Sequence, residues 1–495
     1  MTGRYLITGG YVATMDKILG DIPDGAVLIE NGLIKAVGPA SDFSSVEAEI
    51  IDADGGVIMP GMVDTHRHTC AGLQRGIAAD QSLLQLISNA FQRYFPPMGA
   101  EDLHTACLVG ALEALDCGVT TILDCCEVCK SYEHAEANMR ALVDAGIRGF
   151  FSYGMNDEEY PGIEAGDLAH AARLRDVAKL HAAGTDLVQV AMGLSHPGTL
   201  PFTHTAEEIR FAEERGMLCC SHTGAMKHTP LNKGIRERAD LGLMLPGHVY
   251  IHCTSLTDQE WKLVGETGGK VSIAPETEMQ MGMGLPPFRA CLDHGIDISL
   301  STDTLHAGSP DLLSQMRLGL QMQRCLDNEA ALAKGIFPMR IGLSVRDALV
   351  WGTRNGADAL SLGSQIGTLT PGKKADVVVI TLKRALSPSS YPLGTTVMHA
   401  TGADVDTVLV DGKIRKRHGQ LVGHDLSAIK ARAKEAFDRI NEAMETLPAE
   451  MTEEETLELF FMTERSANIN FAKAYENGLP ETASGRTSWR SETMM

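Results

Sequence analysis

The sequence predicts an α/β fold, a (β/α)8 TIM barrel with a small β-sandwich domain built from both chain ends. Between residue 58 and about residue 360, eight short apolar runs alternate with longer helical stretches, which is the order of a parallel barrel. Before and after that region, apolar and polar residues alternate, and Asn-Gly or Gly-Gly pairs break the runs, as in small antiparallel sheets. A doubly wound open sheet is the alternative, but no G-x-G-x-x-G motif follows a strand, so a dinucleotide site is unsupported.

The domain boundaries follow from these changes along the chain. We expect residues 1–58 to form the first part of the sandwich, 59–365 the barrel, 366–424 the second part of the sandwich, and 425–495 C-terminal helices with a mobile tail. The candidate barrel strands are VIMPGMVDTHRH, VTTILDC, IRGFFSYG, LVQVAMGLSH, MLCCSHT, HVYIHC, KVSIAPE and DISLSTD.

Composition narrows the class of protein and its partners. The 495 residues carry a formal net charge of -21, which argues against nucleic acid or an anionic membrane as a partner, because both need a basic face. No run approaches the length of about 18 apolar residues that a membrane helix needs, and the N-terminus lacks a signal-peptide pattern. The 11 cysteines are an odd number and are expected to be buried, reduced thiols. We therefore expect a cytoplasmic protein with a small-molecule partner.

Four of the predicted strands end in residues of types that bind metal ions. His66 and His68 end the first strand, and residues i and i+2 of a strand point the same way, so both imidazoles can reach one ion. His222, His252 and Asp303 end three other strands, and the active sites of barrels lie at these C-terminal strand ends. Each residue taken alone could instead be a core histidine or a helix cap, but the five together favour a metal site.

The ligand types limit the choice of ion. Three histidines and one carboxylate suit a transition metal better than calcium or magnesium. We expect one divalent ion, with zinc first and iron, cobalt, nickel or manganese as alternatives. Such an ion lowers the pKa of bound water to about 7, which makes hydroxide available at neutral pH. Asp303, at the end of a buried strand, needs a metal, a cation or hydrogen bonds to offset its burial.

Longer motifs run from about residue 5 to residue 422: PGMVDTHRHT, LQRGIAAD, EALDCGVTTILD, SHTG, IHCTSLT, STDT and WGTRNGADALSLGSQIGTLTPGKKADVVVI. In these motifs the chain resembles the amidohydrolase superfamily, in particular the branch that holds atrazine chlorohydrolase, cytosine and guanine deaminases and S-adenosylhomocysteine deaminase. The resemblance implies that His66, His68, His222 and Asp303 bind the metal and that Asp303 also takes a proton from water. It implies that His252 is a catalytic histidine contacting that water or the substrate.

The resemblance also implies a reaction. We expect hydrolysis, by metal-activated water, of a C–N bond other than a peptide bond in a small nitrogen-containing, heterocyclic substrate. Deamination of an aminated heterocycle and hydrolytic dechlorination are alternatives, and a non-catalytic scaffold is a remote one. Binuclear members carry a carboxylated lysine on the fourth strand, and LVQVAMGLSH has no lysine, which favours a single ion. A homo-oligomer, a dimer or higher, is the family-level expectation.

The sequence departs from the deaminase pattern at Ala225. Deaminases of this branch usually carry a glutamate there, three residues after the fifth-strand histidine, and it moves a proton that alanine cannot move. Glu276 or Glu278, in the segment APETEMQMGMG, could supply that carboxylate from across the barrel mouth. Alternatively, these glutamates cap a loop or bind a polar group of the substrate. We take Glu278 as the catalytic candidate and Glu276 as a substrate-binding one.

Three further residues are candidate substrate contacts. His196 follows the fourth strand, His306 follows Asp303, and Gln74 lies in the loop after the first strand. Each could equally be an ordinary loop residue. The run from Cys126 to Cys129 superficially resembles part of the zinc-deaminase signature H-x-E…P-C-x-x-C, but its order is reversed and its proline is missing, so no site is predicted there.

Overall fold

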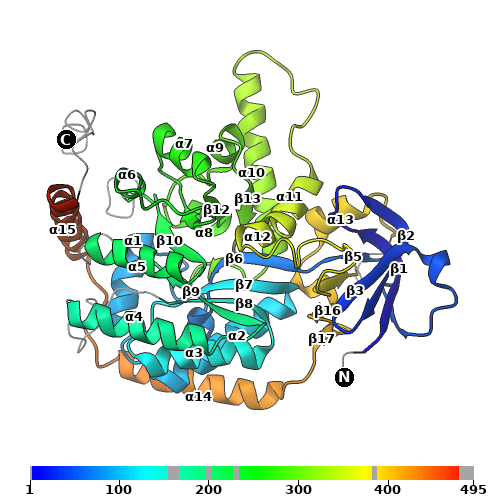
Figure 1. Ribbon diagram of the computed structural model, residues 1–495, viewed down its shortest axis with the longest axis horizontal. Coiled ribbons are helices and arrows are strands. Elements are labelled where there is room, and N and C mark those ends of the chain that lie inside the picture. Colours follow the sequence, from blue (N-terminus) through cyan, green and yellow to red (C-terminus); the bar gives the residue numbers. More distant parts are fainter. Residues whose placement is uncertain (1–2, 154–166, 196–201, 227–233, 382–386, 479–495) are drawn as a thin grey trace.

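The computed structural model of the protein describes residues 3–153, 167–195, 202–226, 234–381 and 387–478. Within these residues the strands form two sheets of nine strands each (Figure 1). One sheet is parallel and comes from the middle of the chain, whereas the other is mixed and comes from both ends. The predicted α/β fold, a barrel joined to a β unit made from the two chain ends, is confirmed.

The parallel sheet closes on itself as a barrel. β13 (Ile298–Leu300) pairs with β12, and β14 (Asp303–Thr304), which follows almost at once, pairs with β6, so the two together serve as the eighth strand. The other strands, in order around the barrel, are β6 (Met62–His68), β7 (Val119–Cys125), β8 (Arg148–Tyr153), β9 (Val188–Gly193), β10 (Cys219–Thr223), β11 (Val249–His252) and β12 (Lys270–Ile273). Each of the eight predicted strands contributes to this barrel.

Helices follow the strands and cover the outside of the barrel, as β-then-α order requires. The longer ones are α2 (Ala100–Asp116), α3 (Tyr132–Ala145), α4 (Asp167–Ala182), α5 (Phe202–Glu214), α7 (Asp258–Glu266) and α10 (Leu312–Leu332). Shorter ones are η2 (Thr69–Leu73), α1 (Leu83–Asn89), η3 (Ala90–Tyr94), α6 (Ile235–Asp240), α8 (Pro275–Gln280), α9 (Phe288–Asp293), α11 (Val345–Trp351) and α12 (Arg354–Ala359). Parallel strands place all their C-terminal ends at one end of the barrel, here called the mouth.

The first predicted strand, at residues 57–68, is two strands rather than one. β5 (Val57–Pro60) pairs with β1 and β15 of the mixed sheet, and only β6 enters the barrel. The chain changes sheets at Pro60-Gly61, where proline has no N–H to donate. A Cβ on Gly61 would lie 2.0 Å from Oγ1 of Thr120, so only glycine fits at this crossing. The split thus reflects both the local Pro-Gly pair and a close contact with a distant residue.

The mixed sheet lies at the end of the barrel opposite the mouth and joins the two chain ends (Figure 1). The strands are β1 (Tyr5–Ala13), β2 (Asp21–Glu30), β3 (Leu33–Pro39), β4 (Glu49–Asp52), β5, β15 (Val377–Ile380), β16 (Val405–Val410), β17 (Lys413–Arg417) and β18 (Gln420–Leu421). β5 and β15 join the two halves through antiparallel pairing. Alternating apolar residues such as Ile7, Val27, Ile58 and Val379 form a separate buried core inside this unit.

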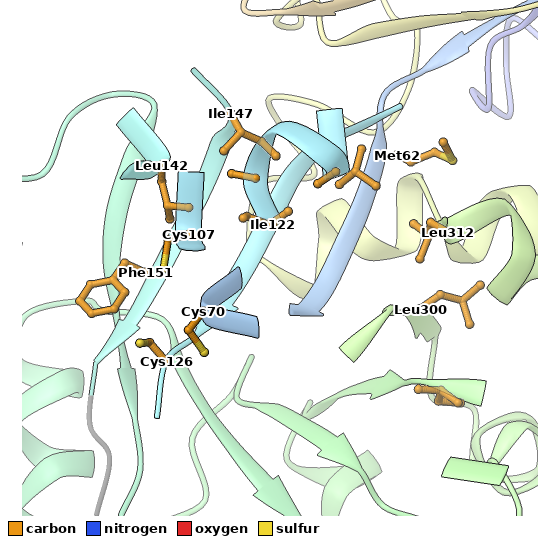
Figure 2. Packing of buried hydrophobic residues seen from close by; sticks show 14 of the residues in the cluster. Met62, Cys70, Cys107, Ile122, Cys126, Leu142, Ile147, Phe151, Leu300 and Leu312 are labelled. Carbon is orange, nitrogen blue, oxygen red and sulfur yellow. The ribbon is translucent and has the colours of Figure 1, made fainter. Parts of the chain in front are cut away.

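The largest core lies between the barrel strands and their helices (Figure 2). Ile122 of β7 and Phe151 of β8 face Leu142 of α3, while Leu300 of β13 lies near Leu312 of α10. Thiols take part in this packing: all 11 cysteines are free, and Cys325 alone is exposed. Cys70, Cys107 and Cys126 lie in the same part of the core. Small apolar thiols therefore fill space close to the mouth.

The end of the described chain is helical. α14 (Leu426–Met444) packs on α2, and α15 (Glu453–Gly478) packs on α1 and α5 at the far end from the mixed sheet. In the mixed-sheet unit, α13 (Pro392–His399) lies between β15 and β16 in the sequence, and the short helices η1 (Ala40–Phe43) and η6 (Gly402–Asp404) adjoin β3 and β16. The predicted mobile tail lies outside the described residues. No helix in the described part of the chain is long and apolar enough to span a bilayer.

Candidate active site

Four barrel strands bring histidine and aspartate side chains together at the mouth. His66 and His68 come from β6, His222 from β10, His252 from β11 and Asp303 from β14. The ring centroid of His66 lies 4.5 Å from that of His68, 4.8 Å from that of His222 and 5.5 Å from that of His252. All five residues predicted to carry the metal site and its chemistry are therefore neighbours.

Asp303 lies between the two histidines of β6. Its Oδ1 is 3.2 Å from Nε2 of His66 and 3.3 Å from Nε2 of His68. The other oxygen, Oδ2, accepts a hydrogen bond of 2.7 Å from the hydroxyl of Thr277. The carboxylate is thus fixed at one oxygen, while the other oxygen faces the imidazoles.

The ring of His66 is completely buried, and neither of its nitrogens has a hydrogen-bond partner among the described residues. A buried polar nitrogen left without a partner is costly. Ligand atoms of His66, His68 and Asp303 lie within 4.8 Å of one another, and so do those of His66, His222 and His252. Imidazole and carboxylate groups at these separations fit a transition metal ion.

The backbone is strained at two of these residues. His252 has φ = 76° and Asp303 has φ = 60°, both in the left-handed region that non-glycine residues seldom adopt. Such a conformation costs about 1–3 kcal/mol per residue and persists where the surrounding structure imposes it. His252 is the last residue of β11 and Asp303 the first of β14, so both strained positions lie at the mouth.

Burial and neighbouring charges shift the pKa values of these groups in opposite directions. Burial, followed by the proximity of His68, lowers the pKa of His66 to about 3, and burial together with His66 lowers the pKa of His222 well below its usual value. Burial alone would raise the pKa of Asp303, but the contacts with His66 and His68 outweigh it and hold that pKa well below the usual range. A neutral imidazole and a carboxylate anion are the protonation states that a metal ion needs, and His66, His222 and Asp303 have them. Burial would lower the pKa of His68, but Glu127 and Asp303 outweigh it and raise that pKa well above its usual value, so His68 must lose a proton when it binds an ion.

The two candidate glutamates have different surroundings. Glu278 is completely buried, and its Oε1 lies 3.2 Å from Nδ1 of His252. Glu276 is turned away: its Oε2 accepts hydrogen bonds from the backbone N–H of Ser309 at 2.9 Å and from Nε2 of Gln315 at 2.8 Å. Glu276 therefore holds a loop in place, which is the alternative role considered for it, whereas Glu278 contacts His252 in the site.

Of the other three predicted substrate contacts, Gln74 and His306 lie next to the site as a pair. Nε2 of His306 is 3.3 Å from Oε1 of Gln74, and Nε2 of Gln74 donates to the carbonyl oxygen of Tyr94. Both side chains are buried, and burial, with a smaller effect of His68, lowers the pKa of His306 to about 3. His196, the third, lies outside the described residues.

Two residues near the site were not predicted from the sequence. Glu127 follows β7, and its Oε1 lies 2.8 Å from Nδ1 of His68. Thr277 fixes Asp303 from α8, as described above. Glu127 stands just after the strand VTTILDC, in the run from Cys126 to Cys129 where no site is predicted, and its place after a strand end was the available signal. Ala225, where the deaminase pattern has glutamate, is buried just past β10.

A parallel barrel with imidazoles and a carboxylate converging at its mouth is the arrangement of a metal-dependent hydrolase. The chain belongs to the amidohydrolase family, because the model of that family matches residues 57–415. The predicted superfamily and the prediction of an enzyme, a hydrolase, are confirmed by this match.

Curated relatives of the chain are named as deaminases. It is 29% identical to a 5'-deoxyadenosine deaminase from Methanothermobacter thermautotrophicus over 81% of this chain and 91% of that protein. It is 30% identical to a 5-methylthioadenosine/S-adenosylhomocysteine deaminase from Symbiobacterium thermophilum over 88% of this chain and 99% of that protein.

Solved structures share the fold. One is an adenosine deaminase from Xanthomonas campestris with bound zinc, at 24% identity and a TM-score of 0.77 over 88% of this chain and 98% of that chain. Another is a mutant of atrazine chlorohydrolase from Arthrobacter aurescens in complex with zinc and atraton, at 20% identity and a TM-score of 0.74 over 88% and 100% of the two chains.

Proposed function

We propose that this protein hydrolyses a C–N bond of a small nitrogen heterocycle with the help of one divalent transition metal ion, zinc first, held by His66, His68, His222 and Asp303. The observation that carries the proposal is the surroundings of His66. Its buried ring has no hydrogen-bond partner among the described residues, yet it faces a carboxylate and lies within 5 Å, between ring centroids, of two other imidazoles. One metal ion at the centre of this group would give a buried ring nitrogen of His66 the partner that it lacks.

When bound, the ion acidifies water so that a nucleophile is available at neutral pH. Asp303 is positioned to take a proton from water beside the imidazoles, because its Oδ1 faces them and Thr277 fixes the carboxylate through Oδ2. His252 has its Nδ1 beside Glu278, which leaves Nε2 to face the substrate and stabilise charge that develops on it. The Gln74–His306 pair offers polar contacts for the ring of a heterocycle.

Deamination is the form of C–N hydrolysis that the named relatives favour. Deaminases of this branch usually have a proton-transferring glutamate at the position of Ala225, and alanine has no acidic group. The leaving group therefore needs another proton donor. Glu278 is the candidate: Oε2 is buried and has no hydrogen-bond partner within the described residues. The substrates of the relatives are adenosine derivatives, and a heterocyclic amine of that size is the first substrate class to test.

We also propose a cytoplasmic homo-oligomer. Eleven free thiols suit a reducing compartment. The loop after α10 exposes Phe337 and Met339, at 79% and 89% of their surface, which is unusual for a protein that stays monomeric. Light scattering coupled to size-exclusion chromatography measures the oligomeric state directly.

The test of the function combines metal analysis with a substrate screen. We expect about one zinc ion per chain, loss of activity on chelation and recovery on adding metal. The screen presents aminated, amidated and chlorinated heterocycles and monitors release of ammonia, amine and chloride. Less than about a tenth of an ion per chain, not restored by added metal, would overturn the metal site. Chloride as the sole product released would overturn C–N hydrolysis.

A further inference from the structure

Glu127 lies against the side of His68 that faces away from Asp303. Its Oε1 is 2.8 Å from Nδ1 of His68, and the carbonyl oxygen of Cys125 is 2.9 Å from the same nitrogen. A carbonyl oxygen and an ionised carboxylate both accept hydrogen bonds and donate none. Nδ1 of His68 therefore carries a proton, which leaves Nε2 as the nitrogen that can bind an ion.

The other ring nitrogen, Nε2, faces the remaining site residues. Nε2 of His68 is 3.3 Å from Oδ1 of Asp303, and its ring lies parallel to that of His222, with 5.5 Å between centroids. A metal-binding histidine usually donates its other N–H to a carboxylate or carbonyl, which fixes the ring and makes the ligating nitrogen more basic. The contacts of His68 have this pattern.

The carboxylate of Glu127 is itself held in place. Its Oε2 lies 3.8 Å from the thiol of Cys70, which can donate a weak hydrogen bond, and its side chain is only 13% exposed. Cys70 belongs to η2, immediately after β6, whereas Glu127 follows β7. The fold therefore brings a carboxylate from one strand end to the histidine of its neighbour.

We propose that Glu127 is a positioning residue for His68, fixing the orientation and tautomer in which Nε2 binds the ion. The inference rests on the metal site of the proposed function. A competing role exists, because ligand atoms of His68, Glu127 and His222 also lie within 4.8 Å of one another and could share an ion. The contact at Nδ1 argues for positioning, since the two nitrogens lie on different sides of the ring and Asp303 lies at Nε2.

The experiment measures zinc affinity and metal stoichiometry of the full chain by competition with a chromophoric chelator. The variants are Glu127→Ala, which removes the acceptor, and Glu127→Gln, which keeps a neutral one. Glu136→Ala is the matched control, because Glu136 is an exposed glutamate on α3. Circular dichroism of the metal-free proteins establishes that each variant is folded, and the absorption bands of the cobalt-loaded proteins report the ligand set.

We expect Glu127→Ala to bind zinc about tenfold more weakly, at the lower end of the effect of such residues, because the carbonyl of Cys125 still holds Nδ1. Glu127→Gln is expected within about threefold of wild type, with one ion per chain and unchanged cobalt bands. Wild-type affinity in Glu127→Ala would overturn the inference. So would a second ion in the wild type that both variants lose, since Glu127 would then be a ligand. A wild-type chain without any metal would overturn the proposed function as well.

Discussion

Glu278 and His252 form a buried pair between neighbouring strand ends at the mouth of the barrel, with Oε1 of the glutamate 3.2 Å from Nδ1 of the histidine. The backbone N–H of Ala274 donates to the same oxygen at 2.8 Å. Burial raises the pKa of Glu278, although the contact with His252 partly opposes it. A carboxyl group with a raised pKa, one fixed oxygen and one free oxygen has the properties of a general acid or base.

Replacing Glu278 by glutamine is therefore expected to lower kcat about 100-fold, the lower end of the contribution of general acid–base catalysis. KM should change little, because glutamine keeps the shape and an acceptor oxygen for His252. Steady-state kinetics on the best substrate from the screen provide the measurement. The control is Glu276→Gln, which loosens a loop and is expected to retain kcat within about threefold. Turnover of Glu278→Gln within a few-fold of wild type would remove Glu278 from proton transfer.

Metal removal is expected to lower the thermal stability of the protein. A ligand that binds only the folded state stabilises it, by about 2.7 kcal/mol at a concentration 100-fold above its Kd. Tm should therefore fall on chelation and recover with added zinc at a fixed scan rate. His66→Ala removes the most buried candidate ligand and should abolish this zinc-dependent rise, whereas His399→Gln, at an exposed position, should keep it. An undiminished rise in His66→Ala would place the ion elsewhere.

The fold and the five central residues were predictable because each carries a local signal. A parallel barrel needs buried strands, and each strand reads as an apolar run whose polar end marks the mouth, as at His222 and Asp303. The histidine pair on β6 follows from the two-residue period of a strand. The change of sheet at Gly61 is marked only by a Pro-Gly pair inside an apolar run, and the close contact of Gly61 with Thr120 on a neighbouring segment cannot be seen in the sequence.

The supporting contacts were less predictable because they depend on how distant segments meet. Glu276 and Glu278 look alike in sequence, but two positions on a helix differ by about 200° in direction, so one holds a loop while the other reaches His252. Glu127 reaches His68 only because β6 and β7 are neighbours in the barrel. Such pairings require the register of the strands, which residue types do not reveal.

Acid should destabilise the protein through His306. Burial lowers the pKa of His306 from 6.5 to about 3. Between these values the unfolded chain binds a proton that the folded chain excludes, so this group makes the free energy of unfolding fall as the pH is lowered from 6.5 toward 3. The slope from one such proton is about 1.4 kcal/mol per pH unit.

The measurement compares the pH dependence of urea unfolding in wild type and His306→Gln, using metal-free protein because acid also releases the ion. Glutamine keeps a hydrogen-bonding group beside Gln74 but is not protonated in this pH range. The free energy of unfolding of His306→Gln should therefore fall less steeply than that of wild type between about pH 5.5 and 4, by about 1.4 kcal/mol per pH unit. His399→Gln is the control and should follow the wild type, because that histidine is exposed. Parallel curves for all three proteins would contradict a neutral, buried His306.

A buried ion pair joins the barrel to the mixed sheet, and breaking it should be costly. Arg148 of β8 donates from Nε and Nη2 to the two oxygens of Asp376, at 2.8 and 3.0 Å, and both side chains are almost fully buried. Arg148→Met leaves the carboxylate buried without its cation, for which we expect a loss of about 3–5 kcal/mol in the free energy of unfolding. In contrast, Lys434→Met breaks the exposed pair of Lys434 and Asp438 on α14 and should cost no more than about 0.5 kcal/mol. Urea denaturation of the metal-free proteins measures both losses.

A loss below about 1 kcal/mol for Arg148→Met would contradict this prediction. It would mean that water reaches Asp376, and that apolar packing rather than this ion pair holds the two sheets together.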